Sequence, residues 1–118
     1  MGYTNIDVAF TNPQNPKQTA NIIGLVDTGA NLSVIPKKLA EALGVKIQGY
    51  QMVKTLNKVR KMGYTDVKIK IEGREGIFRT LISSREDDRI IIGVVPMEVL
   101  GFEIDPINRK LKKVKIYA

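Results

Sequence analysis

The stretch IIGLVDTGANLSVIP, residues Ile22 to Pro36, is an apolar run that ends on an acid, turns, and resumes as a second apolar run. An ionised carboxylate at the end of a buried strand is costly unless its desolvation is offset. We expect Gly29 to take a positive φ, so that the chain doubles back and Asp27 points away from the core. Asp27 is therefore a candidate for chemistry. The alternative is a turn-forming aspartate that only binds backbone amides.

The composition around this stretch excludes several kinds of site. The 118 residues contain no cysteine, histidine or tryptophan. Disulfides, thiol nucleophiles, Ser-His-Asp triads and ordinary zinc sites are therefore absent, and carboxylates become the leading candidates for acid–base chemistry. We expect no cofactor and no metal. The length suits one domain over residues 1–118. Because there is no apolar run of roughly 20 residues and no signal-like start, we expect a cytoplasmic protein without a membrane span.

The net charge of +7 and the pI of about 9.7 raise the question of acidic partners. The cations alternate with other residues in VKTLNKVRKMGY and NRKLKKVKIYA rather than forming a block. Lysines on exposed strand edges deter edge-to-edge pairing and explain such a pattern without a ligand. Single-stranded nucleic acid would also need a spaced aromatic platform. The four tyrosines do not form one, so we do not expect nucleic acid as a partner: Tyr3, Tyr50, Tyr64 and Tyr117.

Working outward from Asp27, the periodicity predicts many short strands. YTNIDVAF and TANIIGLVD are expected to pair as a hairpin, with TNPQNPKQ as the loop between them. In YTDVKIKIEG the apolar residues Val67, Ile69 and Ile71 fall on one face, and EGREG is a hairpin turn. These alternating segments favour a mostly-β barrel or sandwich.

Two short helices interrupt the strands. Pro36 is expected to open PKKLAEALG, with Gly44 as its stop. Pro96 is expected to open VPMEVLG, with Gly101 closing it. Each helix follows an apolar strand, so the two halves of the chain share a strand-then-helix design.

Two other groups of residues could carry chemistry, and we set both aside. Ser33 and Lys37 suggest a Ser-Lys pair, but Ser33 lies on an alternating strand and Pro36 breaks the spacing, so we interpret both as surface residues. Three adjacent acids in SSREDD could bind a hard cation, but such a run is more typical of a solvated turn. These acids are Glu86, Asp87 and Asp88.

LVDTGANLSVIP resembles the active-site segment of the retropepsin-like aspartic proteases, in which apolar residues precede Asp-Thr-Gly and an apolar strand follows. The stretch IIIGVVPMEVLGFEID, Ile90 to Asp105, resembles the second signature of that family, with Ile91, Ile92 and Gly93 as its apolar pair and glycine. The resemblance extends over nearly the whole chain, as far as the turn DPINRKL.

The resemblance implies a closed retropepsin-like β-barrel with short helices, one protomer of a twofold dimer. Each chain of this family supplies one aspartate, so Asp27 is expected to face Asp27 of a second copy. Two carboxylates so close share one proton, and aspartic proteases are the standard example of this behaviour. An aspartic endopeptidase acting on peptides or unfolded protein is implied. Thr28 would brace the two loops across the dimer axis, Gly29 would contact substrate, and Ala30 takes the position that is Ala or Ser.

The family also implies a flap, a hairpin that closes over substrate. By order along the chain its tip is expected at TLNKV: Thr55, Leu56, Asn57, Lys58 and Val59. Viral flaps are glycine-rich at the tip, and this one is not. Its lysines would favour an acidic or extended substrate. Two alternatives stay open: a catalytically silent dimeric module that binds peptide or protein partners, and a basic barrel that binds nucleic acid in a salt-dependent way.

Overall fold

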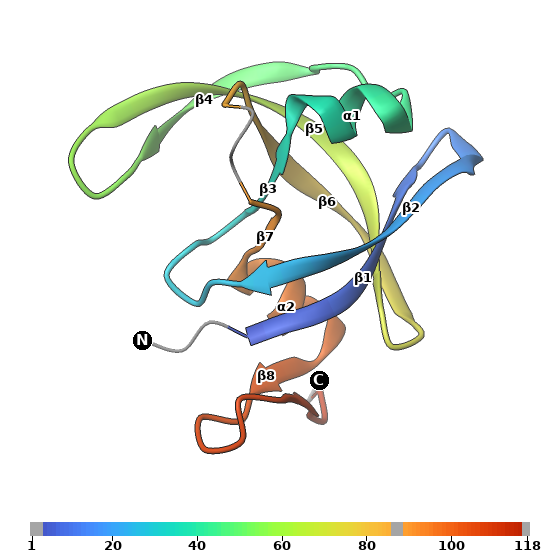
Figure 1. Cartoon of the computed structure of the whole chain (residues 1–118), viewed down its shortest axis with the longest axis vertical. Coiled ribbons are helices and arrows are strands. Elements are labelled where there is room, and N and C mark those ends of the chain that lie inside the picture. The colour runs from blue at the N-terminus through green and yellow to red at the C-terminus, as the bar shows by residue number, and fades with distance from the viewer. Residues whose placement is uncertain (1–3, 86–88, 117–118) are drawn as a thin grey trace.

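The computed structural model describes residues 4–85 and 89–116, and its strands fold into a closed barrel (Figure 1). Two long hairpins, β1–β2 and β5–β6, form much of its wall. Pairing runs in the order β1-β2-β7-β3-β6-β5-β4, and β1 also pairs with β5, so six strands close a ring and β4 extends outside it. The strands are β1 Thr4–Asn12, β2 Asn15–Val26, β3 Ser33–Pro36, β4 Gly49–Lys54, β5 Val59–Ile71, β6 Arg74–Ser83, β7 Ile91–Ile92, β8 Phe102–Ile104 and β9 Leu111–Lys113.

The apolar faces of these strands meet inside the ring. Val67, Ile69 and Ile71 are fully buried, as their alternation predicted, and Phe10 and Ile35 join them from other strands. Buried apolar area of this kind stabilises a fold by roughly 25 cal/mol for each Å² removed from water. The expected mostly-β barrel with short helices is confirmed.

The expected β1–β2 hairpin is also present, but its loop is much shorter than predicted. The strands continue through most of TNPQNPKQ, and only residues 13 and 14 separate them. Side chains supply the reason: Asn12 donates to the Leu43 carbonyl (2.9 Å), and the Gln14 N–H donates to Asn12 (2.9 Å). Polar bonds of this kind anchor a strand end that composition alone assigns to a loop.

The two helices are where the sequence placed them, with small differences at their starts. α1 Lys37–Leu43 begins just after Pro36, and α2 Val94–Leu100 begins two residues before Pro96, because Gly93 is its N-cap. Proline is tolerated anywhere in a first turn, so Pro96 does not mark the first residue. Both helices end on a left-handed glycine as predicted, Gly44 (φ 70°) and Gly101 (φ 79°). Within the described residues, no helix is long and apolar enough to cross a membrane.

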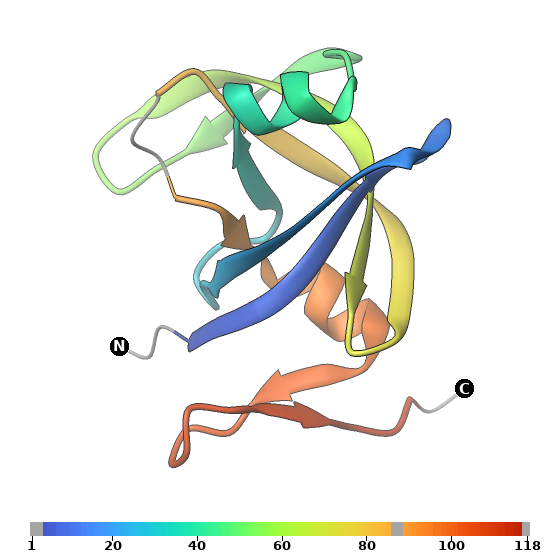
Figure 2. The ribbon, with the colours of Figure 1, turned by 45° about the vertical axis from the view of Figure 1, so that its right-hand side comes forward.

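The C-terminal strands β8 and β9 form a separate two-stranded sheet beside α2 (Figure 2). Arg74, on β6, fixes this unit to the barrel. Its guanidinium donates to the carbonyls of Leu100 (3.0 Å) and Gly101 (2.9 Å) and lies 5.1 Å from the centre of the Phe102 ring. A cation at these positions satisfies carbonyls that a helix C-terminus leaves free.

Candidate functional site

The loop that carries Asp27 is held by backbone hydrogen bonds on both sides. Before the loop, the Asp27 N–H donates to the Ile92 carbonyl (3.1 Å), which continues the parallel pairing of β2 with β7. After it, the N–H groups of Val94 and Val95 donate to the carbonyls of Ala30 (2.8 Å) and Asn31 (3.0 Å). The second signature therefore anchors the first through main-chain hydrogen bonds, although the two are far apart in the sequence.

Within the loop, the carboxylate of Asp27 is half-buried and accepts a hydrogen bond from the Gly29 N–H at 2.9 Å. The Ala30 N–H donates to the Asp27 carbonyl at 3.1 Å. These bonds close an ordinary β-turn, whose central residues need no positive φ. The expected positive φ at Gly29 is accordingly wrong. Glycine serves here by leaving room, since an added Cβ would lie 3.3 Å from the Asp27 carboxylate.

Thr28 and Gly29 lie at the exposed turn of the loop, and Ala30 is half-buried behind them. No described residue forms a hydrogen bond with the Thr28 hydroxyl. Among the described residues, the Asp27 carboxylate has one hydrogen-bond partner, the Gly29 N–H. One chain thus presents an acid and a hydroxyl with unused hydrogen-bonding capacity at the same surface.

The three residues of the second signature have distinct places. Ile91 and Ile92 form β7, which lies between β2 and β3, and Ile92 is fully buried. Gly93 sits directly beneath the chain after Asp27: a Cβ there would come within 2.5 Å of the Asn31 carbonyl oxygen. Real Cβ atoms do not approach backbone so closely, so only glycine fits at this crossing.

The position of Ser33 differs from the one that the sequence predicts. It is fully buried, not a surface residue, and its Oγ accepts a hydrogen bond from the Gly93 N–H at 3.1 Å. Lys37 is exposed, as expected. The signal that could have found Ser33 is its spacing: it shares a strand face with Ile35, which is also fully buried. The Ser33 side chain therefore links the two signatures in addition to the main-chain bonds.

The expected flap segment is the turn of the β4–β5 hairpin. β4 ends at Lys54 and β5 begins at Val59, and both the N–H and the hydroxyl of Thr55 donate to the Lys58 carbonyl (2.8 and 3.0 Å). The hairpin projects beyond the barrel on the same side as the loop of residues 27–32 in both views (Figures 1 and 2). The turn is thus closed by Thr55 rather than by glycine.

The other candidate residues that the structure describes do not assemble into a site. Glu86, Asp87 and Asp88 lie outside the described residues, as do Tyr3 and Tyr117. Among residues 4–85 and 89–116 there is no cluster of three metal-ligating side chains. Tyr50 and Tyr64 are each paired with a cation instead: Lys61 lies 5.1 Å from the Tyr50 ring centre and Arg79 lies 3.8 Å from that of Tyr64.

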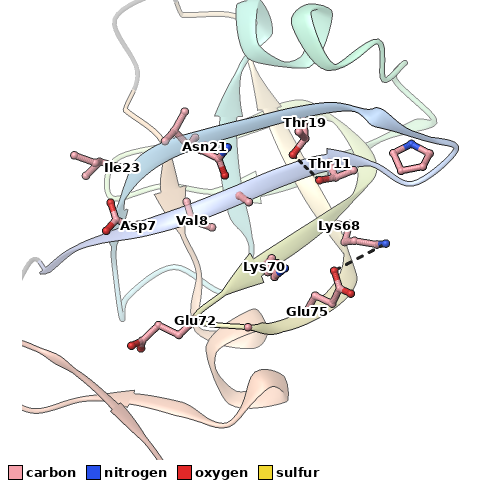
Figure 3. Close-up of a pocket in the computed structure, with 14 residues that line it drawn as sticks. Asp7, Val8, Thr11, Thr19, Asn21, Ile23, Lys68, Lys70, Glu72 and Glu75 are labelled. Carbon is pink, nitrogen blue, oxygen red and sulfur yellow. Dashed lines mark hydrogen bonds and ion pairs between the residues drawn. The ribbon is translucent and has the colours of Figure 1, made fainter.

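A groove of about 630 Å³ runs along the outside of the barrel, between the β1–β2 and β5–β6 hairpins (Figure 3). Its walls carry mixed charges and internal partners, including an ion pair between Lys68 and Glu75 (4.0 Å) and a hydrogen bond between the hydroxyls of Thr11 and Thr19 (2.8 Å). Asp27 does not line it. These four side chains already bond one another in pairs, so they offer less free hydrogen-bonding capacity than the loop does.

Comparison with known proteins agrees with this geometry. A family model described as aspartyl protease matches residues 15–94, which include both the Asp-Thr-Gly loop and β7. Among solved structures, the EIAV protease in complex with the inhibitor HBY-793 is similar, with a TM-score of 0.63 and 21% identity over 82% of this chain and 86% of that chain. At this identity the likeness shows a shared retropepsin-like fold. No curated protein matches the sequence.

Proposed function

The chain belongs to the aspartyl protease family, and we propose that it is an endopeptidase whose active site forms when two copies bring their Asp27 residues together. The observation that carries the proposal is the loop itself. Asp27 is fixed by main-chain bonds from the second signature, yet its carboxylate retains free acceptor capacity at the surface. Neither a core role nor a simple turn role requires both properties at once.

A second copy is needed for a chemical reason. A single carboxylate cannot act as general base and general acid at the same moment, and the chain has one Asp-Thr-Gly. A twofold interface formed by this loop would place the two copies of Asp27 beside each other at the axis. The free hydroxyl of Thr28 beside Asp27 is then available to the partner loop. A homodimer therefore supplies both carboxylates of the proposed active site, of which one protomer supplies one.

The reaction follows from a pair of carboxylates that share one proton. The ionised Asp27 takes a proton from a water molecule between the two, while the protonated Asp27 donates a hydrogen bond to the peptide carbonyl. Water oxygen bonds to the carbonyl carbon, and the tetrahedral intermediate collapses when the C–N bond breaks and the amine receives a proton from the pair. One water and one peptide bond yield one carboxylic acid and one amine, with no cofactor.

The β4–β5 hairpin is proposed to act as the flap over the bound peptide. Support comes from its projection on the same side of the barrel as residues 27–32. Lids of this kind exclude water and hold substrate in place, and their opening can limit turnover.

The test is cleavage of an unfolded protein from roughly pH 3 to pH 8, because the shared proton restricts activity to a pH range. We expect the wild type to cleave and Asp27→Asn to lose at least about 10³-fold in rate, since one acid–base group is removed from each half. Asp7→Asn, at an exposed aspartate on β1, is the matched control and should cleave normally. A folded wild-type dimer without activity at any pH would contradict the proposal.

A further inference from the structure

The β4–β5 hairpin has one face that is apolar and cationic at once. Pairing along the hairpin is uninterrupted: Tyr50 is opposite Gly63, Met52 opposite Lys61, and Lys54 opposite Val59. Side chains directly opposite one another share a face of the sheet. One face of the hairpin is thus formed by Tyr50, Met52, Lys54, Val59, Lys61 and Gly63, and is called here the inner face.

The inner face continues the core face of the barrel. Along β5, every second residue from Val59 leads to Val67, Ile69 and Ile71, which are fully buried. The opposite face is already in use: Met62 is buried, and Gln51 accepts a hydrogen bond from Arg79 at 3.1 Å. The inner face is therefore the outward continuation of the core face of the barrel. The hairpin carries it beyond the barrel on the side where residues 27–32 lie (Figures 1 and 2).

The apolar part of this face is uncovered. Tyr50 is 59% exposed, Met52 63% and Val59 57%, and Leu56 at the tip is fully exposed. Contiguous exposed apolar side chains rimmed by charge mark binding surfaces in soluble proteins. Lys61 stacks on Tyr50 and keeps its charge beside this patch.

The charge on the hairpin has one sign. Residues 49–63 contain Lys54, Lys58, Arg60 and Lys61 and no acidic residue. No described carboxylate forms an ion pair with any of the four. By contrast, Lys68 and Lys112, elsewhere on the protein surface, each have a glutamate partner. An extended peptide lying under the hairpin would meet apolar side chains and unneutralised cations in alternation.

We propose that the inner face and tip of this hairpin select peptide segments in which acidic residues alternate with apolar ones. The inference rests on the proposed function for the site of binding, but the preference itself is a property of the bound state and does not need cleavage. Lys54, Lys58 and Lys61 are the specificity-determining residues, because each supplies an ammonium group without a carboxylate partner among the described residues. Exposed ion pairs contribute modestly to binding free energy. We therefore expect a peptide with two glutamates to bind about tenfold more tightly than one with two lysines.

The experiment measures binding of three matched, fluorescent peptides to the dimeric Asp27→Asn protein, which holds substrate without turning it over. The peptides share apolar residues and carry two glutamates, two glutamines or two lysines. We expect the glutamate peptide to bind about tenfold more tightly than the lysine peptide near pH 6.5, and less so at high salt. The preference should vanish below about pH 4, where the peptide carboxyls are protonated.

Two variants show whether the hairpin is responsible. Changing Lys54, Lys58 and Lys61 to glutamine should remove the preference, whereas the same change at the exposed Lys17, Lys38 and Lys70 should retain it despite an equal change in net charge. The single change Lys58→Glu, in the turn between β4 and β5, should weaken the preference for the glutamate peptide. Equal loss of preference in both triple variants would overturn the proposal, because net charge alone would explain it.

Cleavage of the neutral peptide by the wild type separates this inference from the proposed function. Cleavage without any acidic preference overturns the specificity and leaves the peptidase intact. Acidic preference in binding without cleavage of any peptide supports the specificity and contradicts the peptidase.

Discussion

The loop around Asp27 and the β4–β5 hairpin are built in opposite ways from the same barrel. The loop is tied by three main-chain bonds and one serine to the second signature, and glycine at its crossing leaves no spare room. The hairpin is attached along one face and bare along the other, with Leu56 fully exposed at its tip. A catalytic acid needs a fixed position, whereas a flap, the role proposed for the hairpin, needs freedom to move over a bound peptide.

The contrast is sharpest within strand β5. Val67 is fully buried, while Val59, on the same face, is 57% exposed. Identical side chains thus belong to the core at one end of the strand and lie exposed at the other. Substitutions should therefore affect the free energy of unfolding strongly near the loop and weakly in the hairpin.

Among substitutions outside Asp27, Gly93→Ala should be the most damaging. Its Cβ would come within 2.5 Å of the Asn31 carbonyl oxygen, so the loop must shift. Overpacking of this kind costs about 1–3 kcal/mol, and a displaced Asp27 should lower kcat/KM by about 100-fold. Urea unfolding and peptide cleavage measure the two effects. Asn5→Ala, at an exposed position of β1, is the control and should alter neither greatly; equal effects would show that the crossing is not special.

Ser33→Ala should cost less, about 1–2 kcal/mol. The change leaves the buried Gly93 N–H without its acceptor, and a buried unpaired donor carries its full desolvation penalty. Chemical denaturation gives the value, and Ser84→Ala at an exposed serine provides the reference, expected within about 0.5 kcal/mol of wild type. If Ser33→Ala matched that reference, the serine would not hold the second signature in place.

Asp105 should make a small, pH-dependent contribution. Its carboxylate accepts from the N–H groups of Asn108 (3.2 Å) and Ile107 (2.9 Å), and the bond from Asn108 is the main cause that holds the pKa of Asp105 below its usual value. A lowered pKa stabilises the fold above the unfolded pKa, and that stability is lost as the pH falls through the folded pKa. Acidification below about pH 4 should therefore lower the melting temperature of wild type more than that of Asp105→Asn. Parallel melting curves from both proteins would contradict this.

Met52→Ser should be almost neutral for folding, within about 0.5 kcal/mol, because the side chain is 63% exposed. The proposed flap role still predicts a loss of about tenfold in kcat/KM, through a higher KM, since apolar contact with the peptide is removed. Ile107→Ser, at an exposed isoleucine of the C-terminal turn, is the control. Unchanged kinetics in Met52→Ser would remove the hairpin from the peptide-binding surface.

Much of this arrangement could be predicted from the sequence, for identifiable reasons. Residues whose type is unusual or restricted at their position carried most of the information: Asp27 at the end of an apolar strand, and glycines at the helix ends. Alternation in Val67, Ile69 and Ile71 identified the core face of β5 because only one of its faces is buried there. The turn at Thr55–Lys58 followed from chain order and the family resemblance.

The errors arose where one residue type suits two environments. Ser33 was assigned to the surface because serine usually is exposed, but here it satisfies a buried N–H that the sequence does not display. Gly29 was assigned a positive φ, but the Asp27 carboxylate and carbonyl close the turn without one. At the end of β1, the Asn12 side chain donates a hydrogen bond to the Leu43 carbonyl. No local sequence pattern predicts a partner so distant in the sequence.

One active site, as proposed, needs Asp27 from two copies. The most direct test refolds wild type and Asp27→Asn together at fixed total concentration, so that subunits mix at random, and measures peptide cleavage. If both copies supply the acid, an equal mixture should retain about one quarter of wild-type activity, because only homodimers of wild type are complete. If each chain worked alone, the mixture would retain about one half, and the shared site would be wrong.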